Sequence, residues 1–196
     1  MARVLVACEF SGRVRDAFAA AGHDAWSCDL LPSETPGQHY EGDVRDILGD
    51  GWDLMVAHPP CTYLAYSGAR WFAQRQTEQA EAIAFVRELL AAPVPRIALE
   101  NPAGILGRHI RRHDQVIEPY HYGHGERKAT CLWLHNLPRL QPTDRVPGRE
   151  PRVHRMVKHP DRWKDRSRTY PGIAAAMADQ WGTTLAAGVT AGGPAG

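Results

Sequence analysis

Short apolar runs alternate with segments of helical periodicity along the first two thirds of the chain. The apolar runs have the length of buried strands, and each is followed within a few residues by Gly, Pro or Asn, which favour turns. The predicted strands are 4–8, 23–31, 52–57, 96–99 and 129–134, with a further short element at 41–48.

Amphipathic helices are predicted between these strands. In 13–21, Val14 and Phe18 are among the apolar residues that recur at helical spacing, and Gly22 follows as a stop signal. The segment 76–92 has the same periodicity and ends at a proline. Strands that alternate with helices predict an α/β fold, with a Rossmann-like, mostly parallel sheet and helices on both of its faces.

The chain of 196 residues is long enough for one domain with a full core. We expect 1–136 to form its main body, with a polar loop rich in His and Arg at 103–128. The segment 137–185 is irregular and basic except for a closing helix at 173–181, and we assign it to the same domain. The Gly- and Ala-rich residues 186–196 are predicted to form a flexible tail.

The net charge of +1 conceals an uneven distribution. Residues 108–168 carry 15 Lys and Arg against 7 Asp and Glu, so the rest of the chain is acidic. Lys and Arg make most protein contacts to nucleic acid phosphates. We therefore predict that the basic segment 139–168 contacts a nucleic acid, with a merely solvated basic surface as the alternative.

Four cysteines, Cys8, Cys28, Cys61 and Cys131, are widely spaced and lie in or beside strand-like runs. This distribution is typical of the reducing cytoplasm rather than of a disulfide framework. The first residues lack the basic, apolar and cleavage regions of a secretory signal, and no run of about 18 apolar residues predicts a membrane span. We expect a cytoplasmic protein.

The sequence His58-Pro59-Pro60-Cys61 directly follows one of the predicted strands. Proline fixes its own φ angle and restricts the residue before it, so Cys61 is expected at a fixed place on the carboxyl edge of the sheet. Ligands of open α/β sheets bind at that edge. Taken alone, a single cysteine in this position is more simply explained as a small buried hydrophobe.

Other reactive or ligand-like groups stand at the ends of further predicted strands. Ser11-Gly12 follows 4–8, Asp29 lies about twenty positions beyond that turn, and Glu100 follows 96–99. Because sequential parallel strands end on the same edge of a sheet, these groups are expected to converge with Cys61. A thiol and a carboxylic acid beside a nucleotide pocket suit covalent catalysis on an electron-poor ring.

These motifs, in this order, resemble those of the DNA cytosine-5 methyltransferase family over roughly two thirds of the chain. The resemblance implies that 1–136 is a catalytic domain of the class I methyltransferase type that uses S-adenosylmethionine. The cofactor contacts that it implies come from the loop Phe10-Ser11-Gly12, from Asp29 at the ribose, from Asp43 at the adenine amine, and from Pro59. The target-side residues that it implies are the Pro60-Cys61 pair, the Glu100-Asn101 pair and the basic pair Arg127-Lys128.

The resemblance also implies a reaction, on DNA, by an enzyme of the bacterial or phage type. Cys61 would attack C6 of cytosine while Glu100 holds N3 and the exocyclic amine, after which C5 takes the methyl group and loses its proton. A thiol with a pKa near about 8.5 is mostly protonated at neutral pH, so Cys61 is expected to need local positive charge from Arg127 or Lys128. A target base in duplex DNA has to leave the stack, at a cost of a few kcal/mol.

The chain differs from the family in several places. Arg13-Val14 stands where the adenosyl loop has further glycines, and His58 and Thr62 flank the Pro-Cys pair in place of a small residue and Gln. Only about sixty residues follow Thr130, too few for the family's large target-recognition domain. Target recognition would then come from 142–168, come from a partner protein, or not occur at all.

Three alternative functions remain open. The same cytosine chemistry could act on a free cytosine nucleotide or on RNA. His58-Pro59-Pro60 also resembles the Asp/Asn-Pro-Pro-aromatic signature of amino-methyltransferases, but His and Cys lack the two chemical roles of that signature. A non-catalytic nucleic-acid or metal-binding module is the third, because of the pairs His109 with His113 and His121 with His124. No Cys-x-x-Cys occurs, so we predict no metal site.

Some assignments have simpler structural alternatives. Asp29 could be a solvated turn acid, and Asp43 could cap the turn that follows it. Trp163 could stack on a base, whereas Trp133 lies in a predicted strand and is expected in the core.

Overall fold

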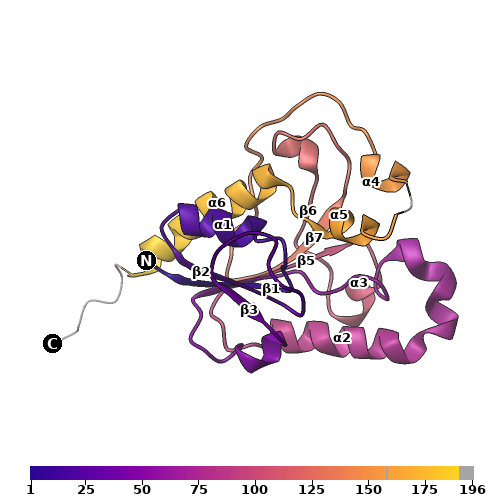
Figure 1. The fold of residues 1–196 in the computed structure, drawn as a ribbon, viewed down its shortest axis with the longest axis horizontal. Helices are drawn as coiled ribbons and strands as arrows, with labels where there is room; N and C mark the ends of the chain where they lie inside the picture. The colour runs from indigo at the N-terminus through magenta and orange to yellow at the C-terminus, as the bar shows by residue number, and fades with distance from the viewer. Residues whose placement is uncertain (158, 190–196) are drawn as a thin grey trace.

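A seven-stranded sheet with the order β3-β2-β1-β4-β5-β7-β6 forms the centre of the molecule (Figure 1). The computed structural model describes residues 1–157 and 159–189. Strands β1 to β5 pair in parallel, and β7 runs antiparallel to both β5 and β6. The strands are β1 (Arg3–Ala7), β2 (Asp24–Asp29), β3 (His39–Glu41), β4 (Leu54–Ala57), β5 (Ile97–Pro102), β6 (Gln115–Ile117) and β7 (Thr130–His135). The α/β fold with a mostly parallel sheet is confirmed.

Helices cover both faces of this sheet. In Figure 1, α1 and α6 lie side by side over one face and α2 lies across the other. The helices are α1 (Arg13–Ala20), η1 (Val44–Asp46), η2 (Tyr66–Gln74), α2 (Gln76–Leu90), α3 (Leu106–His109), η3 (Pro119–His121), α4 (Arg152–Arg155), α5 (Arg162–Ser167) and α6 (Pro171–Val189), where η marks a 3-10 helix. No helix among the described residues is long and apolar enough to cross a membrane.

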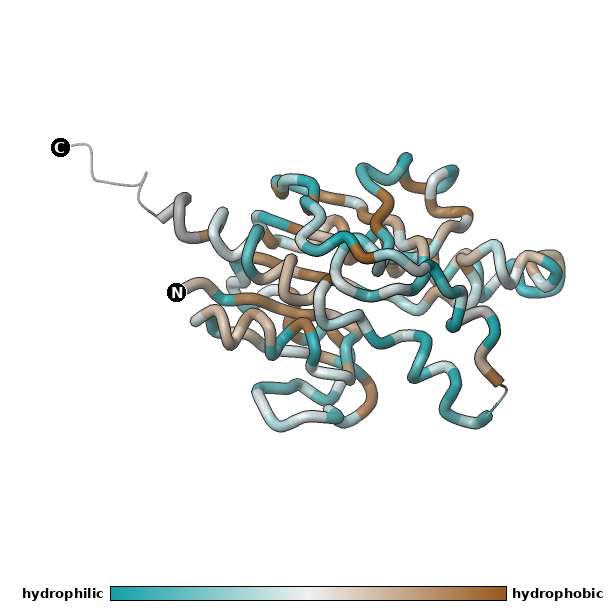
Figure 2. The backbone as a smooth tube through the Cα atoms, turned by 90° about the horizontal axis from the view of Figure 1, so that it is seen from above, coloured by the Kyte–Doolittle hydropathy of each residue, from teal (hydrophilic) through white to brown (hydrophobic). Residues whose placement is uncertain are grey.

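The core is divided by the sheet into two apolar clusters. Along β1, Val4 and Val6 face the α1 and α6 side, whereas Leu5 and Ala7 face the α2 side. Trp181 of α6 is fully buried in the first cluster, and complete burial of such a side chain stabilises a fold by about 1.5–3 kcal/mol or more. Figure 2 shows the same arrangement, with hydrophobic residues along the central strands and hydrophilic residues on outer segments.

The strand order reverses direction between β1 and β4, which places the loops after these strands side by side. Ala7 pairs with Ala57 at the ends of the two strands, and the amide of His58 donates to the carbonyl oxygen of Ala7 at 2.9 Å. The carboxyl edge at such a switch point is where open α/β sheets bind their ligands. The turn that carries Cys61 therefore lies at this edge.

The structure corrects several predicted boundaries. Strand β5 continues through Pro102, because Glu100 and Asn101 pair with β7 instead of starting a loop. The segment 41–48 is the end of a short strand followed by a 3-10 turn. The predicted polar loop 103–128 contains α3, β6 and η3, and the nine-residue helix η2 lies in a region where no helix was predicted.

The basic segment is also more ordered than its sequence indicates. It contains two short helices, α4 and α5, and residue 158 lies outside the described residues. Helix α6 begins before the predicted 173–181 and continues to Val189. The first four positions of the predicted tail 186–196 are therefore helical, and 190–196 lie outside the described residues.

Candidate active site

Cys61 stands in a turn fixed to two neighbouring strands. Pro59 is buried, and its carbonyl oxygen accepts a hydrogen bond of 2.9 Å from Nδ2 of Asn101 on β5. The carbonyl oxygen of Cys61 accepts from the amides of Leu64 and Ala65, both at 3.0 Å, which closes the turn. Pro60 and Cys61 are exposed. Cys61 is thus an exposed residue, in contrast to the alternative of a buried structural cysteine.

Glu100 lies one strand away from this turn. Its side chain is 21% exposed, and its Oε2 atom is 3.4 Å from Nδ1 of His58. Lys128 and Thr130, at the start of β7, line a small cavity together with Glu100 and Tyr170. A carboxyl group, an imidazole, an ammonium and a hydroxyl therefore meet beside the turn that carries the thiol.

The charges around the two candidate reactive groups act in opposite directions. Burial raises the pKa of Glu100, but hydrogen bonding and the charge of His58, the charge of Lys128 and a hydrogen bond from Thr130 together bring this pKa below its ordinary value. The pKa of the Cys61 thiol is raised, mainly by the loss of solvation near the protein and also by the negative charge of Glu100. The positive charges of Arg166 and Lys128 act to lower it. The resting pair is therefore a carboxylate and a protonated thiol at neutral pH.

The loop after β1 is organised by Glu9, a residue that the sequence analysis did not single out. Its carboxylate is buried, and it accepts hydrogen bonds from the amide of Val14 at 2.8 Å, the amide of Arg15 at 3.2 Å and Oγ of Ser11 at 3.1 Å. These amides belong to the first turn of α1, whose N–H groups need an acceptor. An acid shortly before a predicted helix is the sequence signal that could have identified it.

Gly12 in the same loop has a φ of 71°, which favours glycine. A Cβ atom at this position would lie 2.2 Å from Oγ1 of Thr35 and 2.4 Å from Nη2 of Arg15. The side chains of Thr35 and Arg15 therefore leave no room for a Cβ atom at Gly12.

Arg15 is a second residue that sequence reasoning missed. It is 1% exposed, and its guanidinium donates to the hydroxyl oxygens of Ser27, Ser33 and Thr35 at 3.1, 3.0 and 2.6 Å. The side chain therefore ties the segment between β2 and β3 to helix α1, and this segment follows Asp29.

The two predicted cofactor acids have different surroundings. Asp29, at the end of β2, is partly buried, accepts from the amide of Leu31 at 3.0 Å, and has a pKa raised by burial. Asp43 caps η1 by accepting from the amide of Arg45 at 3.0 Å, and it forms an ion pair with the same arginine. This capping role is the structural alternative considered for Asp43.

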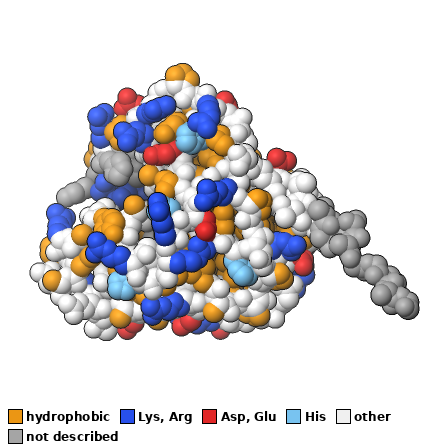
Figure 3. Space-filling view, turned by 180° about the vertical axis from the view of Figure 1, so that it is seen from behind, with side chains coloured by type: hydrophobic (Ala, Val, Ile, Leu, Met, Phe, Trp, Pro, Cys, Tyr) orange, Lys and Arg blue, Asp and Glu red, His pale blue; other side chains and the backbone are white. Residues whose placement is uncertain are grey.

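Helix α5 of the basic segment packs against the loop after β1. The rings of Phe10 and Trp163 are 5.8 Å apart, and Trp163 is 52% exposed. The Arg168 guanidinium forms two hydrogen bonds of 2.8 and 2.6 Å with the carboxylate of Glu34. Seen from behind in Figure 3, Lys and Arg side chains are more numerous than Asp and Glu. The basic segment thus borders the edge of the sheet that carries the candidate site.

The structure separates the predicted basic pair. Lys128 is close enough to Glu100 and Cys61 to influence both pKa values, and its Nζ atom is 3.4 Å from the carbonyl oxygen of Arg168. Arg127 is exposed, and its amide donates to the carbonyl oxygen of Glu150. The second positive charge that acts on the thiol belongs instead to Arg166 of α5, which sequence reasoning did not single out.

The histidines that raised the metal-binding alternative have other contacts. His124 accepts a hydrogen bond from the amide of Gly172 at 3.0 Å, and the ring of His113 packs edge-on against Trp133, which is buried. Within residues 1–157 and 159–189, no three His, Cys, Asp or Glu side chains form a group that could hold a metal ion.

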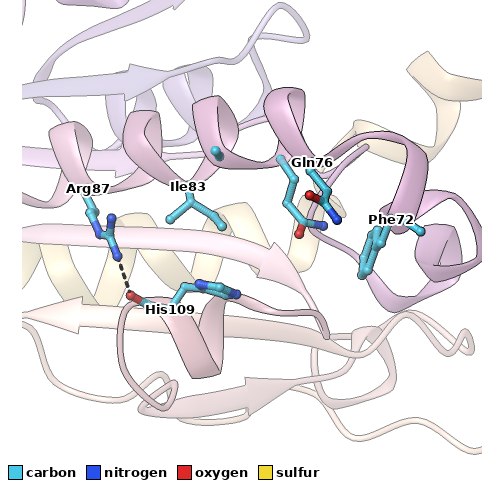
Figure 4. A pocket seen from close by; sticks show the side chains of 8 residues that line it. Phe72, Gln76, Ile83, Arg87 and His109 are labelled. Atoms are coloured by element: carbon cyan, nitrogen blue, oxygen red, sulfur yellow. Dashed lines mark hydrogen bonds between the residues drawn. The ribbon is translucent and has the colours of Figure 1, made fainter.

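A surface pocket of about 500 Å³ lies apart from the predicted site residues. Figure 4 shows it between α2, η2 and α3, with Phe72, Gln76, Ile83 and Arg87 around it, and Arg87 bonded to the carbonyl oxygen of His109 at 3.0 Å. It contains neither an exposed thiol nor a carboxylate, so we assign no chemistry to it.

Comparison with known proteins supports the fold. No protein-family profile and no curated protein sequence matches the chain. Among solved structures, a prophage-encoded Escherichia coli protein assigned as a DNA modification methyltransferase is similar over 75% of this chain and 52% of its own, with 14% identity and a TM-score of 0.50. The Entamoeba histolytica methyltransferase EhMeth is similar over 74% of this chain and 58% of its own, with 12% identity and a TM-score of 0.53.

These similarities define the class of fold. The chain has a fold similar to that of methyltransferases, as the order of its motifs implied. It spans little more than half the length of either structure, so the activities of those proteins do not transfer to it directly.

Proposed function

We propose that the protein transfers a methyl group from S-adenosylmethionine to C5 of cytosine in DNA, through a covalent adduct of Cys61. The observation that carries this proposal is the arrangement of an exposed thiol after β4 and a partly buried carboxylate near the end of the adjacent parallel strand β5. The Asn101–Pro59 hydrogen bond holds the two strand ends together. Covalent chemistry on a pyrimidine needs a nucleophile and an acid in fixed positions on the ring.

The donor side of the site is supported by the loops after β1, β2 and β3. Asp29 has a carboxylate at the edge of the sheet whose only hydrogen-bond donors among the described residues are backbone amides, which leaves capacity for ribose hydroxyls. Phe10, Ser11 and Gly12, with Asp43 and Pro59, would complete the contacts. When bound there, S-adenosylmethionine supplies an electrophilic methyl group.

On the target side, each residue has a defined part. The thiolate of Cys61 forms a bond to C6, while the carboxyl group of Glu100 donates a proton to N3 and accepts from the exocyclic amine. Electron density then moves to C5, which takes the methyl group. Loss of the C5 proton and cleavage of the C6–S bond regenerate the thiolate. Lys128 and Arg166 favour the thiolate because both are positive.

A nucleic acid substrate is supported by the basic segment 139–168 and by exposed aromatic residues around the site. Trp163 is exposed on α5, and Tyr66 and Trp71 are 49% and 53% exposed on η2, the helix that follows Cys61. Aromatic side chains stack on unpaired bases, with a gain of about 1–3 kcal/mol per base. These residues could compensate for the unstacking of a target base that leaves the duplex.

Transfer of labelled methyl groups from S-adenosylmethionine tests this proposal. The purified protein is incubated with duplex DNA, RNA or free cytosine nucleotides, and the products are hydrolysed and analysed. We expect 5-methylcytosine from DNA and none with Cys61→Ala. If only RNA or only the free nucleotide is labelled, that molecule and not DNA is the substrate. Label on the exocyclic amine would overturn the covalent mechanism.

A further inference from the structure

His58 makes a contact with Glu100 that the proposed mechanism does not yet use. His58 follows β4 directly, and its side chain is 11% exposed. Its Nδ1 atom lies 3.4 Å from Oε2 of Glu100, and its Nε2 atom is buried with no hydrogen-bond partner among the described residues. A buried structural histidine usually bonds through both ring nitrogens. Here the carboxylate of Glu100 is the one hydrogen-bond partner of the ring among the described residues.

The contact matters because the proposed chemistry needs a proton that Glu100 does not hold at rest. N3 of cytosine has to be protonated as Cys61 adds to C6, so that negative charge does not build up on the ring. The pKa of Glu100 lies below its ordinary value, so the group is a carboxylate at neutral pH. Another group must therefore supply the proton within the site.

We propose that His58 and Glu100 share one proton, and that His58 supplies it through Glu100 to N3 of the target cytosine. The inference rests on the proposed function, because it assigns a role to a residue beside the same cytosine. His58 acts through Glu100 and does not itself touch the substrate, so it is a positioning residue.

Two protons move before the adduct is complete, one from the thiol of Cys61 and one from His58. The thiol proton of Cys61 is first lost to solvent, since Cys61 is exposed. In the proposed resting state His58 is an imidazolium paired with the carboxylate of Glu100. Its Nδ1 proton passes to Glu100, which donates it to N3 as the S–C6 bond forms, and the ring is left as a neutral imidazole. After methyl transfer, the C5 proton leaves to solvent, the C6–S bond breaks to regenerate the thiolate, and N3 returns its proton through Glu100 to His58.

The other groups that face this pair are few. Lys128 and Thr130 approach Glu100 from β7, and Tyr170 lines the same small cavity beside α6. Cys61 and Cys131 are the thiols whose pKa values the charge of Glu100 raises. Of these groups, Tyr170 and both thiols have raised pKa values, so they remain protonated at neutral pH and none exchanges a proton with Glu100 as readily as an imidazole.

The inference is tested by the pH dependence of adduct formation on DNA that contains 5-fluorocytosine, in single-turnover measurements. His58→Gln can keep a hydrogen bond to Glu100 but carries no mobile proton, and His58→Phe keeps neither. The exposed His135→Gln is a matched control. In wild type the rate is expected to rise as Cys61 deprotonates and to fall when the shared proton is lost.

In His58→Gln and His58→Phe we expect this fall to begin at lower pH, with an adduct rate at pH 8 reduced about tenfold or more, since a carboxyl group alone binds its proton about two pH units more weakly than an imidazole. His135→Gln should behave as wild type. A wild-type pH profile in His58→Gln would reduce His58 to a hydrogen-bonding role and overturn the inference.

A second measurement separates this inference from the proposed function. In nitrogen-15 spectra of the free protein at pH 7, both ring nitrogens of His58 are expected to carry protons, and their signals should change in Glu100→Gln. A neutral ring with a single protonated nitrogen would overturn the inference even if methyl transfer is confirmed. Failure of wild type to form any adduct, with the spectra as expected, would count against the proposed function alone.

Discussion

Nδ2 of Asn101 donates a hydrogen bond of 2.9 Å to the carbonyl oxygen of Pro59, across 42 positions of the sequence. The bond joins the strand that carries Glu100 to the turn that carries Cys61, and Asn101 is 1% exposed. A hydrogen bond in such a buried place fixes the relative position of the two strand ends. The proposed nucleophile and the proposed acid are therefore held in register by a bond between Asn101, next to Glu100, and Pro59, two positions before Cys61.

Replacement of Asn101 by Ala should loosen this connection. We expect a loss of about 1–3 kcal/mol in the free energy of unfolding, because the buried carbonyl oxygen of Pro59 loses its donor. Adduct formation should slow by more than the change in stability explains. Asn136→Gly is the matched control, because Asn136 donates to the carbonyl oxygen of Pro95 but is exposed, and Gly accepts its φ of 52°. Equal effects of both variants on adduct formation would contradict the positioning role of Asn101.

Glu9 should be a stabilising residue as well as part of the donor loop. Glu9→Ala removes the acceptor for two amides of α1 and is expected to cost about 2–3 kcal/mol in chemical denaturation. Glu9→Gln retains one acceptor oxygen and should lose less than Glu9→Ala. Glu78→Ala, at the exposed start of α2, provides a control and should change stability by less than about 0.5 kcal/mol. A Glu9→Ala variant as stable as this control would disprove the capping role.

The ion pair of Arg168 with Glu34 fastens the basic segment beside the loop after β1. A hydrogen bond from Arg168 lowers the pKa of the Glu34 carboxyl, so the pair stabilises the fold above the ordinary pKa of Glu and this contribution fades as the pH falls below about 4. Because the pair is near the surface, a double-mutant cycle of Glu34→Gln and Arg168→Gln should give a coupling energy of only about 0.2–1 kcal/mol at pH 7. A coupling energy that stays unchanged at pH 3 would show that it does not come from the charge of the Glu34 carboxylate.

Nucleic acid binding should depend on the basic segment through charge. Joint replacement of Arg152, Arg155 and Arg166 by Gln is expected to weaken binding to duplex DNA and to reduce the slope of log affinity against log salt by up to about 3, at about 0.9 for each phosphate contact. The exposed pair Arg108 and Arg112 lies outside this segment and serves as the control. An unchanged salt slope in the triple variant would show that these arginines of the basic segment do not contact DNA phosphates.

The central strands of the sheet, such as β1 and β4, were predictable because they are apolar on both faces. Val4 to Ala7, for example, alternate between the two clusters of the core, so each position needs an apolar side chain. The short helices α4 and α5 carry no such pattern, since Arg152 and Arg155 of α4 are exposed and the side chains of α5 are exposed or only partly buried. Their positions depend on distant contacts such as Phe10 with Trp163, which lie far apart in the sequence.

The candidate site was predictable only in part, for a related reason. Cys61 and Glu100 follow directly from strand ends, whereas the capping role of Glu9 depends on the path of the loop between β1 and α1. Arg15 would be placed on the surface of a helix by its residue type, and its burial is explained only by the segment that folds over it. The contact of His58 with Glu100 requires the register of β4 against β5, which local sequence does not specify.

The central claim is that Cys61 is the nucleophile, and one measurement tests it most directly. The protein is incubated with S-adenosylmethionine and duplex DNA that contains 5-fluorocytosine, whose fluorine blocks the final elimination, and the product is analysed by denaturing electrophoresis and peptide mass mapping. We expect a covalent complex with the modified base on Cys61, and none from Cys61→Ser, which should remain folded because Cys61 is exposed. Absence of a complex from wild type, or a complex on another residue, would contradict the account.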